Sequence, residues 1–136
     1  ARIDFADYAR TLIENLFDSY GFNTHHIGLD IKVDALPLNL DRAIPMGLII
    51  NELVSNSLKY AFPDAHPGRI SIALQASGAD RFTLRVSDDG VGLPEDVDIQ
   101  HPASLGLKLV LTLANQIGGK IELDRSQGTV FTISRS

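Results

Sequence analysis

Residues 51–62 read Asn-Glu-Leu-Val-Ser-Asn-Ser-Leu-Lys-Tyr-Ala-Phe, and the rest of the chain is predicted to be arranged around this helix. At about 100° per residue, one face of the helix forms a candidate core face. Its residues are Met46, Ile50, Leu53, Val54, Ser57 and Ala61. Glu52, Asn56 and Lys59 form a polar row within about 60° of one another on a different arc. Such a row suits a metal ion and a phosphate chain, although on the helix alone a solvated face with a weak ion pair is the simpler interpretation.

The composition indicates one globular domain in a reducing compartment. The chain has 136 residues, of which 44% are hydrophobic, enough for one core and too few for two. The net charge of -5 argues against a nucleic-acid or anionic membrane partner, because those partners select for a basic surface. The absence of cysteine excludes disulfides, a thiolate nucleophile and cysteine-based zinc sites. With no apolar run of membrane-spanning length and no charged-then-apolar leader, the chain is predicted to be cytoplasmic, whether or not its parent protein is attached to a membrane.

The apolar periodicity alternates between the spacing of helices and that of strands. It predicts helices over residues 4–20, 41–62 and 104–117, and strands over residues 29–33, 70–74, 82–88, 121–123 and 130–133. This order favours an α/β (α+β) fold, a two-layer sandwich in which helices cover one face of a mixed sheet. Residues 1–136 are predicted to form a single domain, and a helix that begins almost at the first residue suggests a fragment of a longer protein. Residues 94–103 lack a periodic pattern and form either a plain loop or a mobile lid.

Asp88 is the candidate binding residue that the strand pattern indicates most directly. It continues the alternation of the apolar residues before it, so its carboxylate is aimed at the interior where the strand ends. A buried carboxylate is costly unless a partner donates a hydrogen bond to it. Gly90 and Gly92 follow, and they allow a sharp turn and a close approach to a ligand. The alternative is an Asp-Gly turn whose carboxylate caps its own backbone, but the inward phase and the second glycine favour a ligand site.

The helix that Ser104 is predicted to cap offers a second candidate binding element. Gly106 lies in its first turn and would let a phosphate approach the free amides at that end. No Gly-Lys-Ser/Thr loop and no Gly-x-Gly-x-x-Gly pattern is present, so neither common nucleotide motif applies. His25 and His26 are adjacent in a loop without a third ligand, which favours an ordinary surface pair over a metal site.

Four stretches in a fixed order resemble the nucleotide-binding boxes of the GHKL superfamily, which includes gyrase, Hsp90, histidine kinases and MutL and has the Bergerat ATP-binding fold. They are Asn-Glu-Leu-Val-Ser-Asn-Ser-Leu-Lys-Tyr at 51–60, Asp-Asp-Gly-Val-Gly at 88–92, Ser-Leu-Gly-Leu-Lys-Leu-Val at 104–110 and Gly-Thr-Val-Phe at 128–131. The set is most similar to the catalytic ATP-binding domain of sensor histidine kinases. The lead-in at 38–50 resembles the subgroup with the second type of histidine-kinase dimerisation domain.

The resemblance implies roles at the phosphate end of a nucleotide site. Asn56 would bind Mg²⁺ through its side-chain oxygen. Lys59 would face the phosphates, and Tyr60 would lie near the nucleotide. Glu52 would be the catalytic residue, which orients the attacking water in ATPases of the superfamily and would help to polarise the acceptor histidine in a kinase. The turn that opens the phosphate-facing helix would consist of Leu105, Gly106 and Leu107.

The resemblance also implies roles at the adenine end. Asp88 would accept a hydrogen bond from the adenine amino group, and Thr129 would support this end of the site. Gly90 and Gly92 would let the chain close over the nucleotide. Ser104 and Ser126 stand where many relatives have glycine, and the lid is short, which bears on the geometry of the lid.

The function implied by the resemblance is Mg²⁺–ATP binding and transfer of the γ-phosphoryl group to a histidine in two-component signal transduction. The partners would be the protein's own dimerisation and phosphoacceptor domain, a response regulator, and a second copy in a full-length homodimer, with no nucleic acid or direct membrane contact. No histidine of this chain lies in a phosphoacceptor-like helix, so the chain alone is expected to bind ATP with little transfer. The alternatives are a stand-alone serine kinase of the anti-sigma-factor type and a non-catalytic nucleotide-binding regulatory module.

Overall fold

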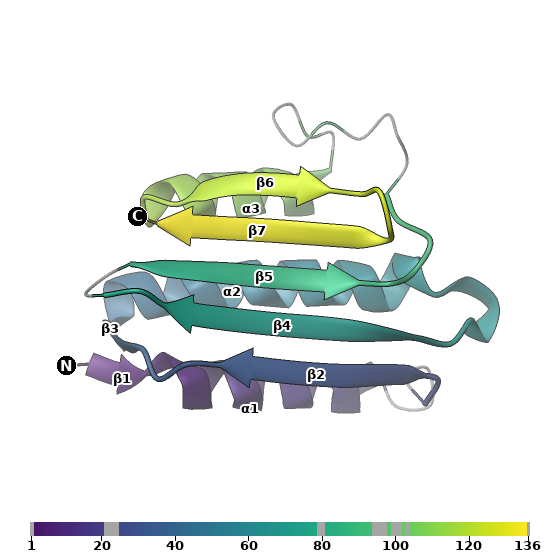
Figure 1. The fold of residues 1–136 in the computed structure, drawn as a ribbon, viewed down its shortest axis with the longest axis horizontal. Helices are drawn as coiled ribbons and strands as arrows, with labels where there is room; N and C mark the ends of the chain where they lie inside the picture. Colours follow the sequence, from purple (N-terminus) through teal and green to yellow (C-terminus); the bar gives the residue numbers. More distant parts are fainter. Residues whose placement is uncertain are drawn as a thin grey trace.

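The computed structural model describes residues 2–20, 25–78, 81–93, 98, 102 and 104–135. Its main feature is a five-stranded sheet with the strand order β2-β4-β5-β7-β6 (Figure 1). The strands are β2 (Ile27–Val33), β4 (Gly68–Ala76), β5 (Phe82–Asp88), β6 (Lys120–Asp124) and β7 (Thr129–Arg135). β2 is parallel to β4, and the other neighbours are antiparallel. The sheet is therefore mixed, as the order of elements predicts.

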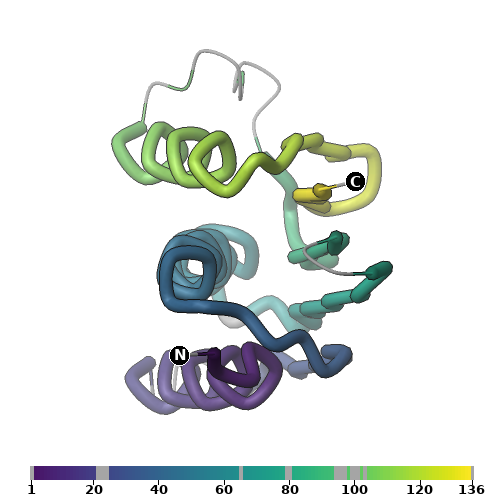
Figure 2. Tube along the Cα trace, turned by 90° about the vertical axis from the view of Figure 1, so that its left-hand side faces the viewer, coloured from purple at the N-terminus to yellow at the C-terminus, as the bar shows by residue number. Residues whose placement is uncertain are grey.

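Helices cover one face of this sheet. They are α1 (Phe5–Tyr20), α2 (Leu40–Asn56) and α3 (Leu105–Gln116), and the edge-on view in Figure 2 shows all three on the same side. The core lies between the two layers, because the apolar face of each helix meets the alternating apolar face of the strands. Its fully buried members include Phe5, Ile13, Met46, Ile50, Ile70, Ile72, Leu84 and Ile133. The predicted two-layer α/β sandwich is confirmed.

Two short strands beside the first helix have no counterpart in the sequence prediction. β1 (Arg2–Asp4) pairs antiparallel with β3 (Pro37–Asn39). Three residues are too few to display an alternating pattern, so periodicity cannot reveal such strands. The predicted cap of the first helix is confirmed, since Asp4 Oδ1 accepts a hydrogen bond from Ala6 N at 3.0 Å.

The central helix ends in a wider turn than its sequence indicates. α2 is followed by η2 (Ser57–Ala61), a π-helical turn, and by η3 (Pro63–Ala65), a short 3₁₀ turn that begins at a proline. A π-helical turn closes hydrogen bonds five residues apart, so the spacing of 100° per residue no longer applies beyond Asn56. The predicted helix over residues 41–62 therefore exists, but its last turn has a different phase.

The strand registers place Asp88 at the end of the central strand. It lies opposite Ile70 of β4 on one side and opposite Thr129 of β7 on the other. Asp88 is 7% accessible and therefore belongs to the interior. The predicted inward direction of Asp88 is confirmed. Within the described residues, no helix combines the length and hydrophobicity that a membrane span requires.

Candidate nucleotide site

The Asp88 carboxylate is buried and accepts two hydrogen bonds. Ser57 Oγ donates to Asp88 Oδ2 at 2.7 Å, and the main-chain N of Gly90 donates to Asp88 Oδ1 at 3.0 Å. Burial raises the pKa of Asp88 above its ordinary value, because an apolar environment disfavours the charged form. The bonds from Ser57 and Gly90 lower that pKa in turn, and the neighbouring Asp89 charge raises it. The Asp88 carboxylate is thus a hydrogen-bonded polar group at the edge of the apolar core.

Ser57 is a residue of this group that sequence reasoning missed. The helical pattern assigned it to the core face, and its burial confirms that position. Its hydrogen bond to Asp88 joins residues on a helix and a strand that are distant in the sequence. The available signal was a hydroxyl on an otherwise apolar face, because a buried hydroxyl needs a partner.

Three glycines surround the Asp88 carboxylate and the main chain that carries it. A Cβ atom at Gly90 would overlap the main-chain oxygen of Ala61 and lie 2.7 Å from its carbonyl carbon. Gly128 has a φ of 73°, and a Cβ atom there would overlap the main-chain oxygen of Asp88. Gly92, with a φ of 78°, lies against Gly128. The loop after β5 and the turn before β7 are thus packed together at backbone distance.

The Gly90→Ala substitution is expected to destabilise the fold by about 1–3 kcal/mol, because the added methyl group meets main-chain atoms that cannot rotate away. Chemical denaturation of the purified chain measures this free energy of unfolding. Val91→Ala is the matched control, since the Val91 side chain is 64% exposed and its main-chain bond to Ala61 O at 2.9 Å does not depend on it. That control is expected to change stability by less than about 0.5 kcal/mol. Equal stability of Gly90→Ala and the natural chain would contradict the packing described above.

Glu52, one residue of the polar row, faces the start of α3. Glu52 and Asn56 are both half-buried. A Cβ atom at Gly106 would lie 2.8 Å from Glu52 Oε2, so the glycine is what leaves room for this carboxylate. Ser104 Oγ accepts a hydrogen bond from Leu107 N at 3.2 Å, which confirms the predicted cap of α3. Glu52 and the first turn of α3 therefore border the same space.

The other predicted site residues differ in their burial and in the element that carries them. Thr129 is buried beside Asp88 in the β5–β7 ladder. Lys59 and Tyr60 lie on the exposed side of η2, where Tyr60 is 68% accessible, and the predicted alignment of Lys59 with Glu52 and Asn56 is altered by the π-helical phase. Leu105 is 82% exposed and projects away from the core, whereas Leu107 is half-buried.

Two further sequence predictions concern the surroundings of the site. Most of the predicted lid, residues 94–103, lies outside the described residues. Across the part of the chain that is described, no group of three or more His, Cys, Asp and Glu side chains is arranged to hold a metal ion.

A family model of known proteins matches most of this chain. The family is described as histidine kinase-, DNA gyrase B-, and HSP90-like ATPase, and the match covers residues 41–135. That range contains every residue that the sequence analysis assigned to the nucleotide site. The family match and the geometry of the site thus concern the same elements.

Individual relatives agree with this family. The chain is 39% identical over 92 residues to the sensor histidine kinase PdtaS of Mycobacterium tuberculosis, a match over 67% of this chain and 17% of that protein. It is 28% identical over 108 residues to blue-light-activated histidine kinase 2 of Erythrobacter litoralis, over 79% of this chain and 31% of that protein. The chain thus spans less than a third of the length of either relative.

The solved histidine kinase domain of a blue-light-activated histidine kinase from Erythrobacter litoralis has the same fold. It superposes with a TM-score of 0.89 at 25% identity, over 97% of this chain and 60% of that one. The correspondence extends beyond the family match to α1 and β2, which precede residue 41. The chain therefore belongs to the histidine kinase-, DNA gyrase B- and HSP90-like ATPases, as an ATP-binding catalytic domain of the sensor histidine kinase type.

Proposed function

We propose that this domain binds Mg²⁺–ATP and that the protein containing it transfers the γ-phosphoryl group to a histidine on a separate dimerisation and phosphoacceptor domain. The observation that supports it most strongly is the buried Asp88 carboxylate, held by Ser57 and Gly90 at the end of the central strand. Gly90 N caps the carboxylate within an Asp-Gly turn, as the alternative interpretation of the sequence expects, but burial of the charged group still costs free energy that a hydrogen-bond donor on a ligand would offset. The glycine-lined backbone around it and the polar row on α2 supply the rest of a nucleotide site.

Asp88 is suited to recognise the amino group of adenine. Each carboxylate oxygen has two lone pairs, and Ser57 and Gly90 each occupy one of them. Acceptor capacity therefore remains for a donor on the ligand. Because water is largely excluded from this position, a hydrogen bond formed there is stronger than at the surface. Thr129, buried beside Asp88, is proposed to support the same end of the nucleotide.

The phosphates are proposed to lie between the polar row and the first turn of α3. Free main-chain amides at a helix N-terminus attract anions, and the absence of a side chain at Gly106 allows close approach. Leu105 and Leu107 flank Gly106 in this turn, and the Leu107 amide donates to Ser104 Oγ. Lys59 and Tyr60 are exposed on η2, from which long side chains can reach a bound nucleotide. Gly90 and Gly92 let the loop after β5 pass close to the ligand.

Asn56 is proposed to bind a Mg²⁺ ion that is shared with the nucleotide. Magnesium prefers oxygen ligands and commonly takes only one or two from the protein, with the rest from phosphates and water. The side-chain oxygen of Asn56 is of this kind and is half-buried on α2. When bound, Mg²⁺ would neutralise charge on the phosphates. Glu52, beside the first turn of α3, is proposed as the catalytic residue that polarises the acceptor histidine.

The remaining parts of the proposal concern the longer protein. The relatives are histidine kinases more than twice the length of this chain, and we assign residues 1–136 to the catalytic domain of such a protein. Its partners are proposed to be the phosphoacceptor domain of the same protein, a second copy in a homodimer, and a response regulator. The domain is proposed to act in the cytoplasm.

The test is transfer of labelled γ-phosphate from ATP in the full-length parent protein, followed by treatment of the product with acid and with alkali. A label that is lost in acid and retained in alkali identifies phosphohistidine and is the expected result. The Glu52→Gln variant of the same protein should bind ATP and incorporate much less label, because it keeps the shape of the side chain without its charge. An acid-stable label on another protein would indicate a serine kinase, and bound ATP without any label would indicate a regulatory module.

A further inference from the structure

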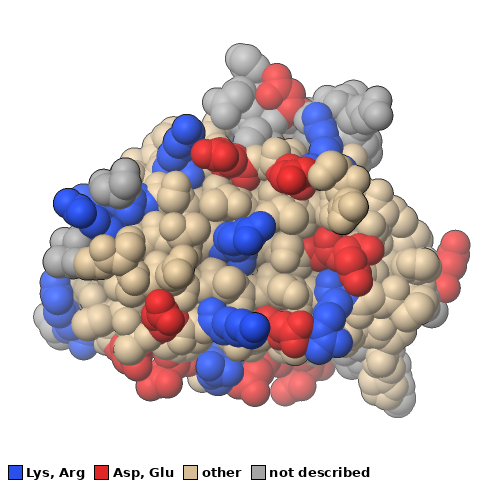
Figure 3. Space-filling model, viewed as in Figure 1, with Lys and Arg blue, Asp and Glu red and all other residues tan. Residues whose placement is uncertain are grey.

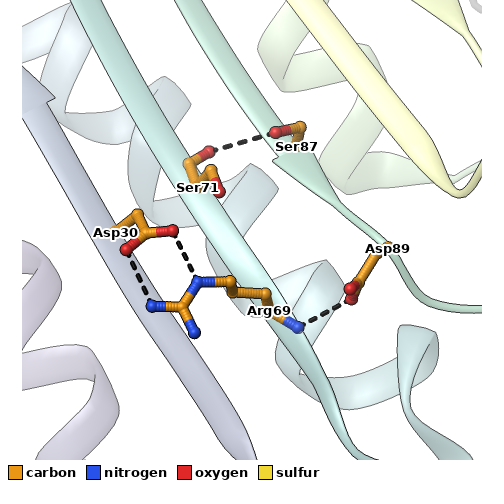
Figure 4. A network of polar contacts seen from close by, with 5 residues as sticks. All are labelled: Asp30, Arg69, Ser71, Ser87 and Asp89. Atoms are coloured by element: carbon orange, nitrogen blue, oxygen red, sulfur yellow. Dashed lines mark hydrogen bonds and ion pairs between the residues drawn. The ribbon is translucent and has the colours of Figure 1, made fainter.

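A second carboxylate, that of Asp89, holds the loop that leaves β5. Asp89 N donates to the main-chain oxygen of Arg69 at 3.3 Å. Asp89 Oδ1 accepts from the main-chain N of Arg69 at 2.7 Å (Figure 4). An antiparallel ladder continued past the Ile70–Asp88 pair would offer Arg69 N the main-chain carbonyl of Asp89 instead. The side chain thus replaces its own carbonyl. The chain can turn away at Gly90 while the amide of Arg69 keeps a partner.

Gly68 makes room for this carboxylate and for the end of the central helix. A Cβ atom at Gly68 would lie 2.6 Å from Asp89 Oδ1 and would overlap the ring of Phe62. Phe62 directly follows η2, and Ala61 in η2 accepts the main-chain bond from Val91. The contacts around Asp89 therefore join the end of the helix, the start of β4 and the loop after β5.

The Arg69 side chain is engaged on the opposite side of β4. Its guanidinium donates to both carboxylate oxygens of Asp30 on β2, with Nη2 and Oδ1 2.8 Å apart (Figure 4). A Cβ atom at Gly28 would lie 2.5 Å from Arg69 Nη1, so the absence of a side chain at Gly28 leaves room for the guanidinium over β2. The pair is exposed on the open face of the sheet, where basic and acidic side chains are interspersed (Figure 3), and such pairs add little stability. Its effect is geometric, because it directs the guanidinium away from the carboxylate of Asp89.

We propose that Asp89 is a positioning residue for nucleotide recognition, which fixes the point where β5 leaves the sheet and thereby the orientation of Asp88. The inference rests on the proposed role of Asp88 in binding adenine. Asp88 is the residue before Asp89 and belongs to the last pair of the β4–β5 ladder. A shift of the main chain at Asp89 would move the Asp88 carboxylate relative to Ser57 and to a bound base. Hydrogen bonds weaken steeply with such misalignment, so base recognition depends on the anchor.

Asp34 provides a matched control at the other end of β4. Asp34 N donates to Leu74 O at 2.9 Å, and Asp34 Oδ2 accepts from the main-chain N of Ala76 at 3.0 Å. A carboxylate therefore accepts a hydrogen bond from a main-chain N at both ends of β4. Asp34 bonds two different residues, Leu74 and Ala76, whereas Asp89 bonds Arg69 alone. Ala76 lies about 23 Å along the strand from Arg69, so the contact of Asp34 is remote from the proposed nucleotide site.

The experiment measures the affinities of the natural chain and of three variants for ATP and for GTP with Mg²⁺ by calorimetry, together with thermal unfolding. Asp89→Ala is expected to weaken ATP binding about tenfold and to reduce the preference for ATP over GTP, because a charged hydrogen-bond acceptor is lost. Asp89→Asn keeps a carbonyl acceptor and should recover most of the affinity. Asp34→Ala is expected to lower the unfolding temperature about as much as Asp89→Ala does and to leave both nucleotide affinities unchanged.

Two results would overturn the positioning role. One is an unchanged ATP affinity in Asp89→Ala. The other is an equal loss of affinity for ATP and for GTP in Asp89→Ala, if Asp89→Asn does not recover it or if Asp34→Ala shows the same loss. Either result would leave the proposed function intact, provided that the natural chain binds ATP and Asp88→Asn binds it much more weakly. Failure of the natural chain to bind ATP would refute the proposed function, and this inference with it.

Discussion

The Asp88→Asn variant is expected to bind ATP about 100-fold more weakly than the natural chain, while remaining folded. The carboxamide offers one acceptor oxygen in place of two, so the adenine amino group would be buried without a good partner. The fold should tolerate the change, because Asn Oδ1 can accept from Gly90 N and Asn Nδ2 can donate to Ser57 Oγ. Calorimetric titration with ATP measures the affinity. An affinity equal to that of the natural chain would refute the adenine role of Asp88.

The same variant tests the electrostatic cost of the site through its pH dependence. Burial raises the pKa of Asp88 in the folded chain above its ordinary value of 3.8, so the folded state binds this proton more tightly than the unfolded state. The contribution of Asp88 to stability is therefore unfavourable at neutral pH and improves as the pH falls through the raised pKa towards the ordinary one. Asn carries no such dependence. The unfolding temperature of Asp88→Asn relative to the natural chain is expected to be highest at neutral pH and to decline as the pH is lowered.

The Asn56→Ala variant is expected to lose the part of ATP affinity that depends on Mg²⁺, about 100-fold at saturating Mg²⁺. The methyl side chain supplies no oxygen ligand, and a nucleotide-bound magnesium ion takes only one or two ligands from the protein, so the loss of one is large. Titration with ATP in Mg²⁺ and again in a chelator separates this effect from a general loss of binding. In the chelator the variant and the natural chain are expected to bind ATP similarly.

Asn115→Ala is the matched control for this experiment. Asn115 is exposed near the C-terminal end of α3, the end opposite Gly106, so its side chain is remote from the proposed phosphate position. The control variant should match the natural chain in both titrations. A loss of affinity in Asn56→Ala that is equally large with and without Mg²⁺ would contradict the metal role and indicate a change in the fold of the site.

Most of the fold can be predicted from the local periodicity of apolar residues in the sequence. The helices and the five sheet strands each repeat apolar residues over several turns or alternations, and their order already favours one covered sheet. The inward direction of Asp88 belongs to the same class of prediction, because a strand has a fixed period of two. The short strands β1 and β3 were not predicted, because three residues are too few to show a period. The π-helical turn at residues 57–61 was not predicted, because no local pattern in these residues indicates one.

The nucleotide site could be predicted in its parts but not in its assembly. Gly90, Gly92 and Gly106 are recognisable as places where a ligand or a backbone comes close, and the family resemblance assigns them to one nucleotide. Which atoms they approach is a matter of packing: Gly90 lies against the main chain of Ala61, and Gly106 lies against the side chain of Glu52. Such contacts between distant segments depend on the relative placement of helix and sheet. Their positions were predictable, but their neighbours were not.

The sequence by itself determined the layers, the order of helices and strands, and the burial of a carboxylate at the end of β5, because these depend on the periods of helix and strand alone. Only the tertiary structure decided that Ser57 donates to that carboxylate, and that Asp89, the next residue, accepts a hydrogen bond from Arg69. Both contacts join residues 20 or more positions apart. A hydrogen bond requires atoms to meet within a few tenths of an ångström, and that precision arises only when the packed core sets helix against sheet.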